Sequence, residues 1–112
     1  MIELDEMTSL SNLDPQGMFG HVAALAQQCR SAWAAAQRLK LPDRYRKASR
    51  VVISGMGGSA IGGDLAAAVV ATRSPTPVLV NRDYQLPAYV GRETLVIASS
   101  YSGNTEETLA AF

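Results

Sequence analysis

The sequence predicts an α/β fold built on a parallel sheet, and two observations lead to that class. Residues 51–54, 78–80 and 94–98 are short apolar runs rich in β-branched residues, without the alternation of a half-exposed strand. Such runs are typical of strands buried on both faces. Segments of helical composition follow the first and third runs, so strands alternate with helices. We therefore expect a doubly wound parallel sheet.

Composition narrows the class of protein. Of the 112 residues, 47% are hydrophobic and 18% charged, which is typical of a soluble globular chain. The formal net charge of zero provides no basic surface for nucleic acid. The longest apolar run, residues 65–71, is far below the roughly 20 residues that span a bilayer. The single cysteine, Cys29, suits a reducing compartment. We expect a cytoplasmic protein with no nucleic-acid or membrane partner.

An amphipathic helix is predicted ahead of the first strand. Asp14 and Pro15 form a helix start, with Asp14 as N-cap and proline at the first helical position. The predicted helix ends at Leu41-Pro42. Apolar residues recur along it at steps of three and four, and they are Met18, Val22, Leu25, Cys29, Trp33 and Ala36. The helix is expected to pack on a sheet through this face, or to form a lid over it. His21 has no second ligand at a suitable spacing, so no metal site is predicted.

The first strand runs into a glycine-rich turn, residues 55–59, which is named the first loop. A helix is predicted over residues 59–72 directly after it. Glycines such as Gly57 and Gly58 let the chain turn tightly and let a ligand approach the backbone. The start of a helix presents unpaired N–H groups and a positive dipole end. The first loop is therefore expected to bind an anion.

A second loop, residues 100–105, follows the third strand and is rich in hydroxyl groups. Ser100, Ser102 and Thr105 lie within six residues, just before a helix predicted near Glu106. Because the carboxyl ends of parallel strands meet at one edge of a sheet, the two loops are expected to converge there. Hydroxyls and backbone N–H groups can hold a phosphate without a charged side chain. The alternative is that Ser102 or Asn104 merely caps the next helix, but capping needs only one such side chain.

Other glycine-loop chemistries can be compared directly. A P-loop requires a lysine before the serine, and residue 58 is glycine. A nucleophile elbow requires a glycine two residues after Ser59, where Ile61 stands. Residues 55–60 do fit the dinucleotide pattern G-x-G-x-x-A, with Asp83 or Arg82 near the ribose. A nicotinamide-dependent oxidoreductase therefore stays an alternative.

Three segments, taken together, resemble one known family. They read GGSAIGGD (57–64), DYQLP (83–87) and SYSGNTEETL (100–109). In this order they are similar to bifunctional phosphoglucose/phosphomannose isomerases, which belong to the sugar isomerase (SIS) domain class. The resemblance covers about half of the chain and implies a Rossmann-like SIS domain that grips a sugar phosphate. The phosphate-binding residues that it implies are Gly58, Ser59, Ser100, Ser102 and Thr105.

The family interconverts glucose 6-phosphate or mannose 6-phosphate with fructose 6-phosphate. The resemblance implies this aldose–ketose isomerisation, a homodimer when intact, and no metal or organic cofactor. Catalytic Glu, His and Lys residues of the family lie beyond the matching stretch, so no catalytic residue is assigned in this chain. Alone, these residues are expected to be inactive.

The same comparison implies the domain organisation. Residues 1–48 are expected to be an N-terminal segment with the amphipathic helix, and residues 49–112 the first, incomplete half of a SIS domain. The chain would then be the N-terminal part of a longer protein. A SIS module can also be a sensor that binds a phosphosugar without catalysis, and this alternative stays open.

Overall fold

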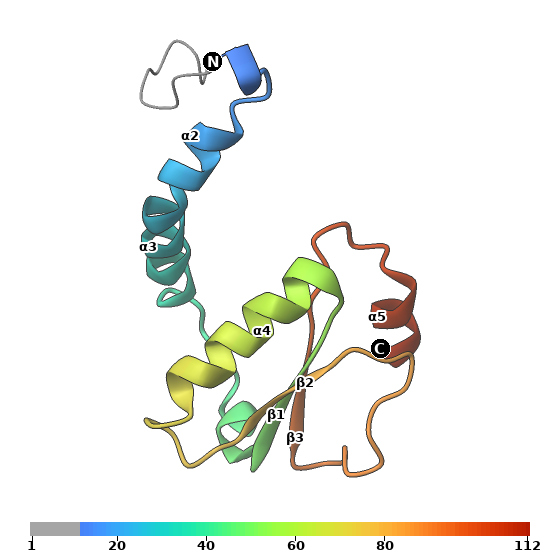
Figure 1. Ribbon diagram of the computed structural model, residues 1–112. Helices are drawn as coiled ribbons and strands as arrows, with labels where there is room; N and C mark the ends of the chain where they lie inside the picture. Colours follow the sequence, from blue (N-terminus) through green and yellow to red (C-terminus); the bar gives the residue numbers. More distant parts are fainter. Residues whose placement is uncertain (1–11) are drawn as a thin grey trace. The chain divides into compact units, whose positions relative to one another are not determined.

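The computed structural model describes residues 12–112 (Figure 1). The chain divides between Lys40 and Leu41 into two compact units. Residues 1–11, the start of the predicted N-terminal segment, lie outside the described residues. The predicted domain boundary at residues 48 and 49 stays a prediction. No helix in the described part is both long and apolar enough to cross a membrane.

The first unit contains α2 (Met18–Ala23) and α3 (Leu25–Ala36), which Ala24 separates. The predicted helix start at Pro15 is one turn too early. Gly17 has φ 69°, in the left-handed region, and α2 begins after it. The predicted N-cap is also wrong, because Gly17 and not Asp14 holds that position. The Asp14 carboxylate nevertheless accepts the N–H of Met18 at 2.7 Å and of Phe19 at 2.6 Å, the first two residues of the helix. The predicted packing of this helix on a sheet stays a prediction.

The hydrogen bonds of Asp14 to the start of α2 are expected to depend on pH. Hydrogen bonds from the amides of Phe19 and Met18 favour the charged carboxylate and lower the pKa of Asp14 below its ordinary value. The stabilisation is complete above the ordinary aspartate pKa and is lost as the pH falls through the lowered pKa. The amide shifts of both residues, followed by NMR, should titrate below the ordinary midpoint. Asp14→Asn should abolish the titration, and an ordinary or higher midpoint would contradict these hydrogen bonds.

The second unit is a parallel α/β unit. Its elements are η1 (Asp43–Lys47), β1 (Arg50–Ser54), α4 (Gly57–Val70), β2 (Val78–Asn81), β3 (Thr94–Ala98) and α5 (Glu106–Ala111). Within the described residues the strands form one sheet in the order β2-β1-β3, and both pairings are parallel. The predicted fold class is confirmed, and each predicted strand lies inside an observed one. The helix α4 begins two residues before the predicted position 59.

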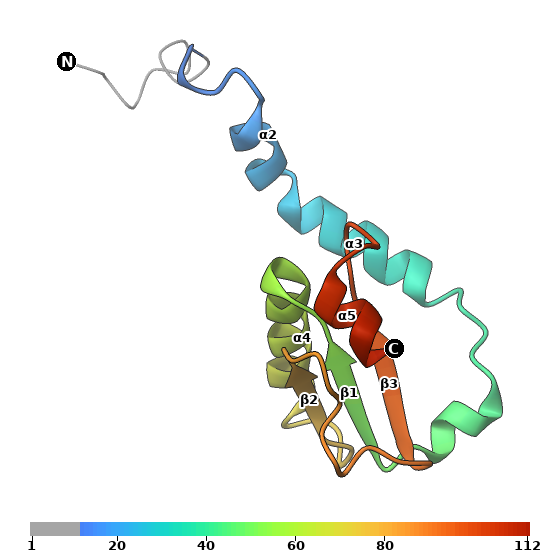
Figure 2. The ribbon, with the colours of Figure 1, turned by 90° about the vertical axis from the view of Figure 1, so that its right-hand side faces the viewer.

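Helices lie on both faces of this sheet and cover them in part, since Leu79 on one face is 39% exposed and Ile97 on the other is 44% exposed. Figures 1 and 2 together show α4 against one face and α5 against the other. A Cβ added to Gly63 of α4 would lie 3.1 Å from Ile53 Cγ2 and Val80 Cγ2, so the absence of a side chain there lets the helix approach the sheet closely. Val52 points to the opposite face, because strand side chains alternate, and it is completely buried. The two-sided cover explains why the strands are apolar without alternation.

The register places the carboxyl ends of the strands level with one another. Ser54 pairs with Asn81 of β2 and with Ala98 of β3. Just beyond these pairs, the Gly55 N–H donates to the Asn81 carbonyl at 3.1 Å, and the Ser99 N–H donates to the Ser54 carbonyl at 2.8 Å. The side chains of Ser54 and Asn81 are buried, and the Asn81 amide donates to Ser54 Oγ at 3.3 Å. These hydrogen bonds hold the start of the first loop and the start of the second loop side by side.

Candidate functional site

The first loop presents backbone amides at the start of α4. Gly57 has φ 51°, a conformation that favours glycine, and it is the first residue of the helix. The carbonyl of Met56 accepts the N–H groups of Ser59 at 3.1 Å and of Ala60 at 3.3 Å. The amides of Gly57 and Gly58 precede the first intrahelical hydrogen bonds, so they are available to a ligand.

The second loop brings its three hydroxyl groups together. Ser100 Oγ lies 2.9 Å from Thr105 Oγ1 and 3.4 Å from Ser102 Oγ, and the last two atoms are 3.3 Å apart. Backbone amides support this triangle, because the Gly103 N–H donates to Ser100 Oγ at 3.0 Å and the Asn104 N–H to Ser102 Oγ at 3.3 Å. The loop is thus folded around its own hydroxyl groups.

This network decides against the simple capping alternative. The N-cap of α5 is Thr105, and no side-chain hydrogen bond caps the helix there. Ser102 accepts a hydrogen bond from Asn104 within the loop, before the helix begins. Neither Ser102 nor Asn104 is therefore the N-cap of α5.

Both loops line one open hollow of about 620 Å³. Its lining residues are Met56, Gly58, Ser59, Tyr101, Ser102 and Thr105. Four of the five predicted phosphate-binding residues are in this set. The fifth, Ser100, does not line the hollow, but its hydroxyl contacts that of Thr105. The structure therefore brings the predicted residues together at the edge where the strands end.

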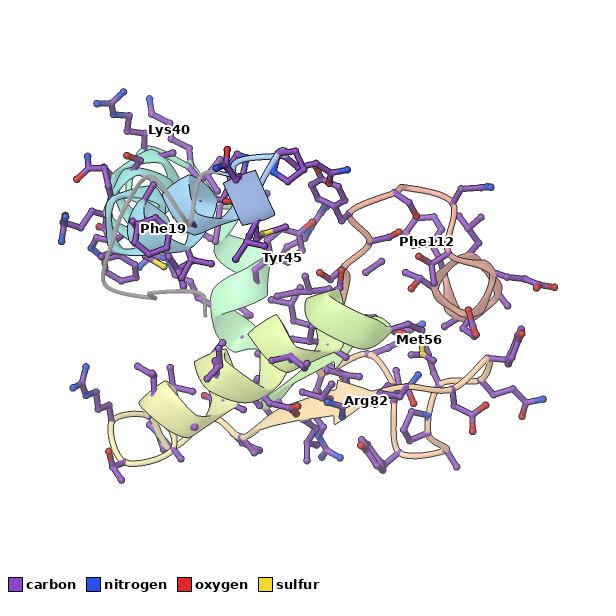
Figure 3. All side chains as sticks on the ribbon, turned by 45° about the horizontal axis from the view of Figure 1, so that its top comes forward. Phe19, Lys40, Tyr45, Met56, Arg82 and Phe112 are labelled. Atoms are coloured by element: carbon purple, nitrogen blue, oxygen red, sulfur yellow. The ribbon has the colours of Figure 1, made fainter. Side chains whose placement is uncertain are left out.

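Two residues that line the hollow were not predicted from the sequence. Met56 is the residue before α4, and Figure 3 shows it beside the first turn of that helix, on the side of α5. Tyr101 stands between the two serines of the second loop and is fully exposed. An aromatic residue flanked by hydroxyl residues in a predicted ligand loop was the available signal for Tyr101. Nothing in the sequence marked Met56.

Two negative charges follow the second loop directly in the sequence. None of the six residues that line the hollow has a carboxylate or basic side chain. Glu106 and Glu107 begin α5 directly after Thr105, and their negative charges raise the pKa of Tyr84 in the loop after β2. The same field disfavours an anion nearby, so amides, hydroxyls and the α4 dipole would have to offset it. The segment 83–87 also lies toward this edge of the sheet, as that effect on Tyr84 indicates.

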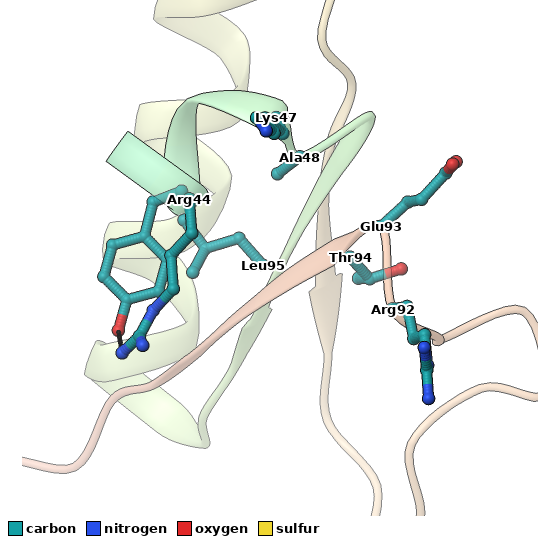
Figure 4. Close-up of a pocket in the computed structure, with 8 residues that line it drawn as sticks. Arg44, Lys47, Ala48, Arg92, Glu93, Thr94 and Leu95 are labelled. Atoms are coloured by element: carbon teal, nitrogen blue, oxygen red, sulfur yellow. Dashed lines mark hydrogen bonds between the residues drawn. The ribbon is translucent and has the colours of Figure 1, made fainter. Parts of the chain in front are cut away.

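A second hollow of about 390 Å³ is formed around the other end of β3 (Figure 4). It contains none of the predicted residues, although Arg44, Lys47 and Arg92 contribute to its lining. Figure 4 shows Arg44 and Arg92 on opposite sides of β3, so these cations do not converge on one point. The Arg44 guanidinium lies 5.1 Å from the centre of the Tyr45 ring. We consider the first hollow the functional candidate because its donors do converge.

The residues that the dinucleotide alternative needs are engaged elsewhere. Arg82 forms an ion pair with Asp64 of α4. The Asp83 carboxylate accepts the N–H of Tyr84 at 2.7 Å. Both side chains therefore already have a partner within the chain.

Fold and site together define a class: a parallel α/β domain with a polar hollow between the loops that follow β1 and β3. Comparison with known proteins narrows this class to the proteins that the chain resembles in sequence. The chain is 50% identical over 95 residues to a bifunctional phosphoglucose/phosphomannose isomerase of Caldicellulosiruptor bescii, a match covering 85% of this chain and 28% of that protein. The enzyme of the same name from Thermoplasma acidophilum is 49% identical over 63 residues, covering 56% of this chain and 19% of that protein.

A further relative of that name, from Aquifex aeolicus, is 51% identical over 63 residues, covering 55% of this chain and 20% of that protein. The predicted resemblance to bifunctional phosphoglucose/phosphomannose isomerases is confirmed, and it concerns their N-terminal part. The matching part of the chain covers between 19% and 28% of the length of these curated relatives. No family model matches the chain. No solved structure matches it.

Proposed function

We propose that this chain forms the phosphate-binding part of a hexose-phosphate isomerase. The observation that carries the proposal is the single hollow lined by both loops, with donors from each. The names of the similar proteins support the reaction, in which glucose 6-phosphate or mannose 6-phosphate is interconverted with fructose 6-phosphate. The intact enzyme would be a cytoplasmic homodimer that uses no metal or organic cofactor.

The phosphate would lie between the two loops. The Gly58 amide and Ser59 hydroxyl would donate from the first loop, and Ser102 and Thr105 from the second. Hydrogen bonds to a charged group contribute about 1.5–3 kcal/mol each, so a few neutral donors can hold a phosphate. The dipole of the 14-residue helix α4 adds to this attraction at its first turn.

Holding the phosphate contributes to catalysis without any proton transfer by this chain. The phosphate does not react, so its binding energy can position the reacting C1 and C2 carbons against an acid and a base. Those groups would be supplied by the remainder of the intact enzyme, since the residues that line the hollow include no carboxylate, imidazole or amine side chain. The role of these residues would be anchoring.

The test is an NMR titration of the isotope-labelled chain with inorganic phosphate, fructose 6-phosphate, fructose and NAD. We expect saturable shifts at Gly58, Ser59, Ser102 and Thr105 with the two phosphates. Fructose alone should cause no shift at these residues, and NAD should bind much more weakly than fructose 6-phosphate. Shifts confined to Lys47 and Arg92, or no saturable shift with either phosphate, would refute the proposal.

A further inference from the structure

We propose that Tyr101 and Met56 form an apolar wall of the hollow and contact the carbon body of the sugar. The proposal rests on the proposed function, because it assigns the part of the ligand next to the phosphate. It predicts that the site distinguishes a sugar phosphate from inorganic phosphate. Phosphate donors alone would bind both ligands with similar affinity.

The exposure of Tyr101 is the first observation. The residue is fully exposed, although it lines the hollow together with the hydroxyl residues. The other tyrosines are less exposed, for example 47% for both Tyr84 and Tyr89. An aromatic ring has a large apolar surface that gains free energy when another apolar surface covers it. A ligand in the hollow is therefore the natural group to cover Tyr101.

The position of Met56 is the second observation. Met56 lines the same hollow from the first loop, so each loop contributes one large apolar side chain as well as hydrogen-bond donors. A thioether side chain is flexible and adapts to irregular surfaces. The hollow thus pairs polar groups for a phosphate with apolar groups beside them. A sugar phosphate has the same division, since its C–H groups are weakly polar and its phosphate is charged.

In the second loop, hydrogen-bonding side chains and the aromatic ring alternate along the sequence. Ser100 and Ser102 direct their hydroxyl groups to Thr105. Tyr101 stands between them and makes no hydrogen bond to this triangle. Its hydroxyl is therefore not part of the loop's own network, and the ring is available to a ligand.

The experiment compares dissociation constants for fructose 6-phosphate and inorganic phosphate, measured by calorimetry on the full chain. Tyr101→Ala should weaken fructose 6-phosphate binding about tenfold and change phosphate binding less than about twofold. Tyr101→Phe keeps the ring and should retain most of the affinity. Met56→Ala should weaken fructose 6-phosphate severalfold. The matched control is Tyr89→Ala, because Tyr89 is exposed but lies over Arg50 at the start of β1.

The outcomes separate the wall from the phosphate site. Equal losses for both ligands in Tyr101→Ala would mean that the ring only supports the loop, and would overturn the proposal. If the unmodified protein bound fructose 6-phosphate no more tightly than inorganic phosphate, the apolar wall would be refuted. The proposed phosphate site would not be affected by that result. Failure to bind either ligand would refute the proposed function, and the wall with it.

Discussion

Replacing Gly55 with alanine is expected to destabilise the second unit by about 3 kcal/mol. A Cβ at this position would lie 2.7 Å from the backbone oxygen of Ser99 and 3.3 Å from Ser59 Cβ. The Ser99 oxygen cannot move aside easily, because the same residue donates its N–H to the Ser54 carbonyl at 2.8 Å. Urea unfolding followed by far-UV circular dichroism would measure the loss. Trp33 fluorescence is unsuitable because this residue lies in the first unit.

Gly62→Ala is the matched control for this prediction. A Cβ on Gly62 would meet no atom within 4 Å, and the residue lies inside α4. Alanine favours a helix interior over glycine by about 1 kcal/mol, so this variant should be slightly more stable than the unmodified chain. If Gly55→Ala were as stable as Gly62→Ala, the close approach of Gly55 to the Ser99 backbone oxygen would be refuted.

The fold of the second unit was predictable because its signals are local. Val52 and Ile53 point to opposite faces and both are apolar, which requires a sheet covered on both sides. Glycines after the first strand and hydroxyl residues after the third indicated two ligand loops. Parallel strands end at one edge, so the convergence of Ser59 and Ser102 on one hollow followed from topology.

The remaining features depend on contacts that a linear pattern does not carry. The buried hydrogen bond from Asn81 to Ser54 joins residues of neighbouring strands, and each side chain alone resembles an ordinary turn residue. The start of α2 at Met18 depends on the left-handed conformation of Gly17. Hydroxyl residues before a helix are typical of caps, yet here they bond to one another. Local propensity could not choose between these uses of the same residues.

Ser100→Ala is expected to weaken fructose 6-phosphate binding by tenfold or more, equivalent to about 1.4 kcal/mol. The side chain does not line the hollow, so its effect would come through the residues that do. Ser100 Oγ accepts the Gly103 N–H at 3.0 Å and lies 2.9 Å from Thr105 Oγ1. Without it, the Gly103 amide loses its partner and Thr105 loses the contact that orients its hydroxyl. The dissociation constant from calorimetry measures the loss.

Ser74→Ala provides the matched control for this prediction. Ser74 Oγ also accepts a backbone amide, that of Thr76 at 3.1 Å, but it lies in the turn between α4 and β2. Removing it should cost comparable stability, about 1 kcal/mol, and leave the affinity for fructose 6-phosphate unchanged. If the two variants bound the ligand equally well, the hydroxyl triangle would have no part in holding the phosphate. A loss of affinity in Ser100→Ala alone would show that the second loop must be ordered before it binds the phosphate. Preorganised donors need no further ordering when the ligand arrives, so they bind it more tightly.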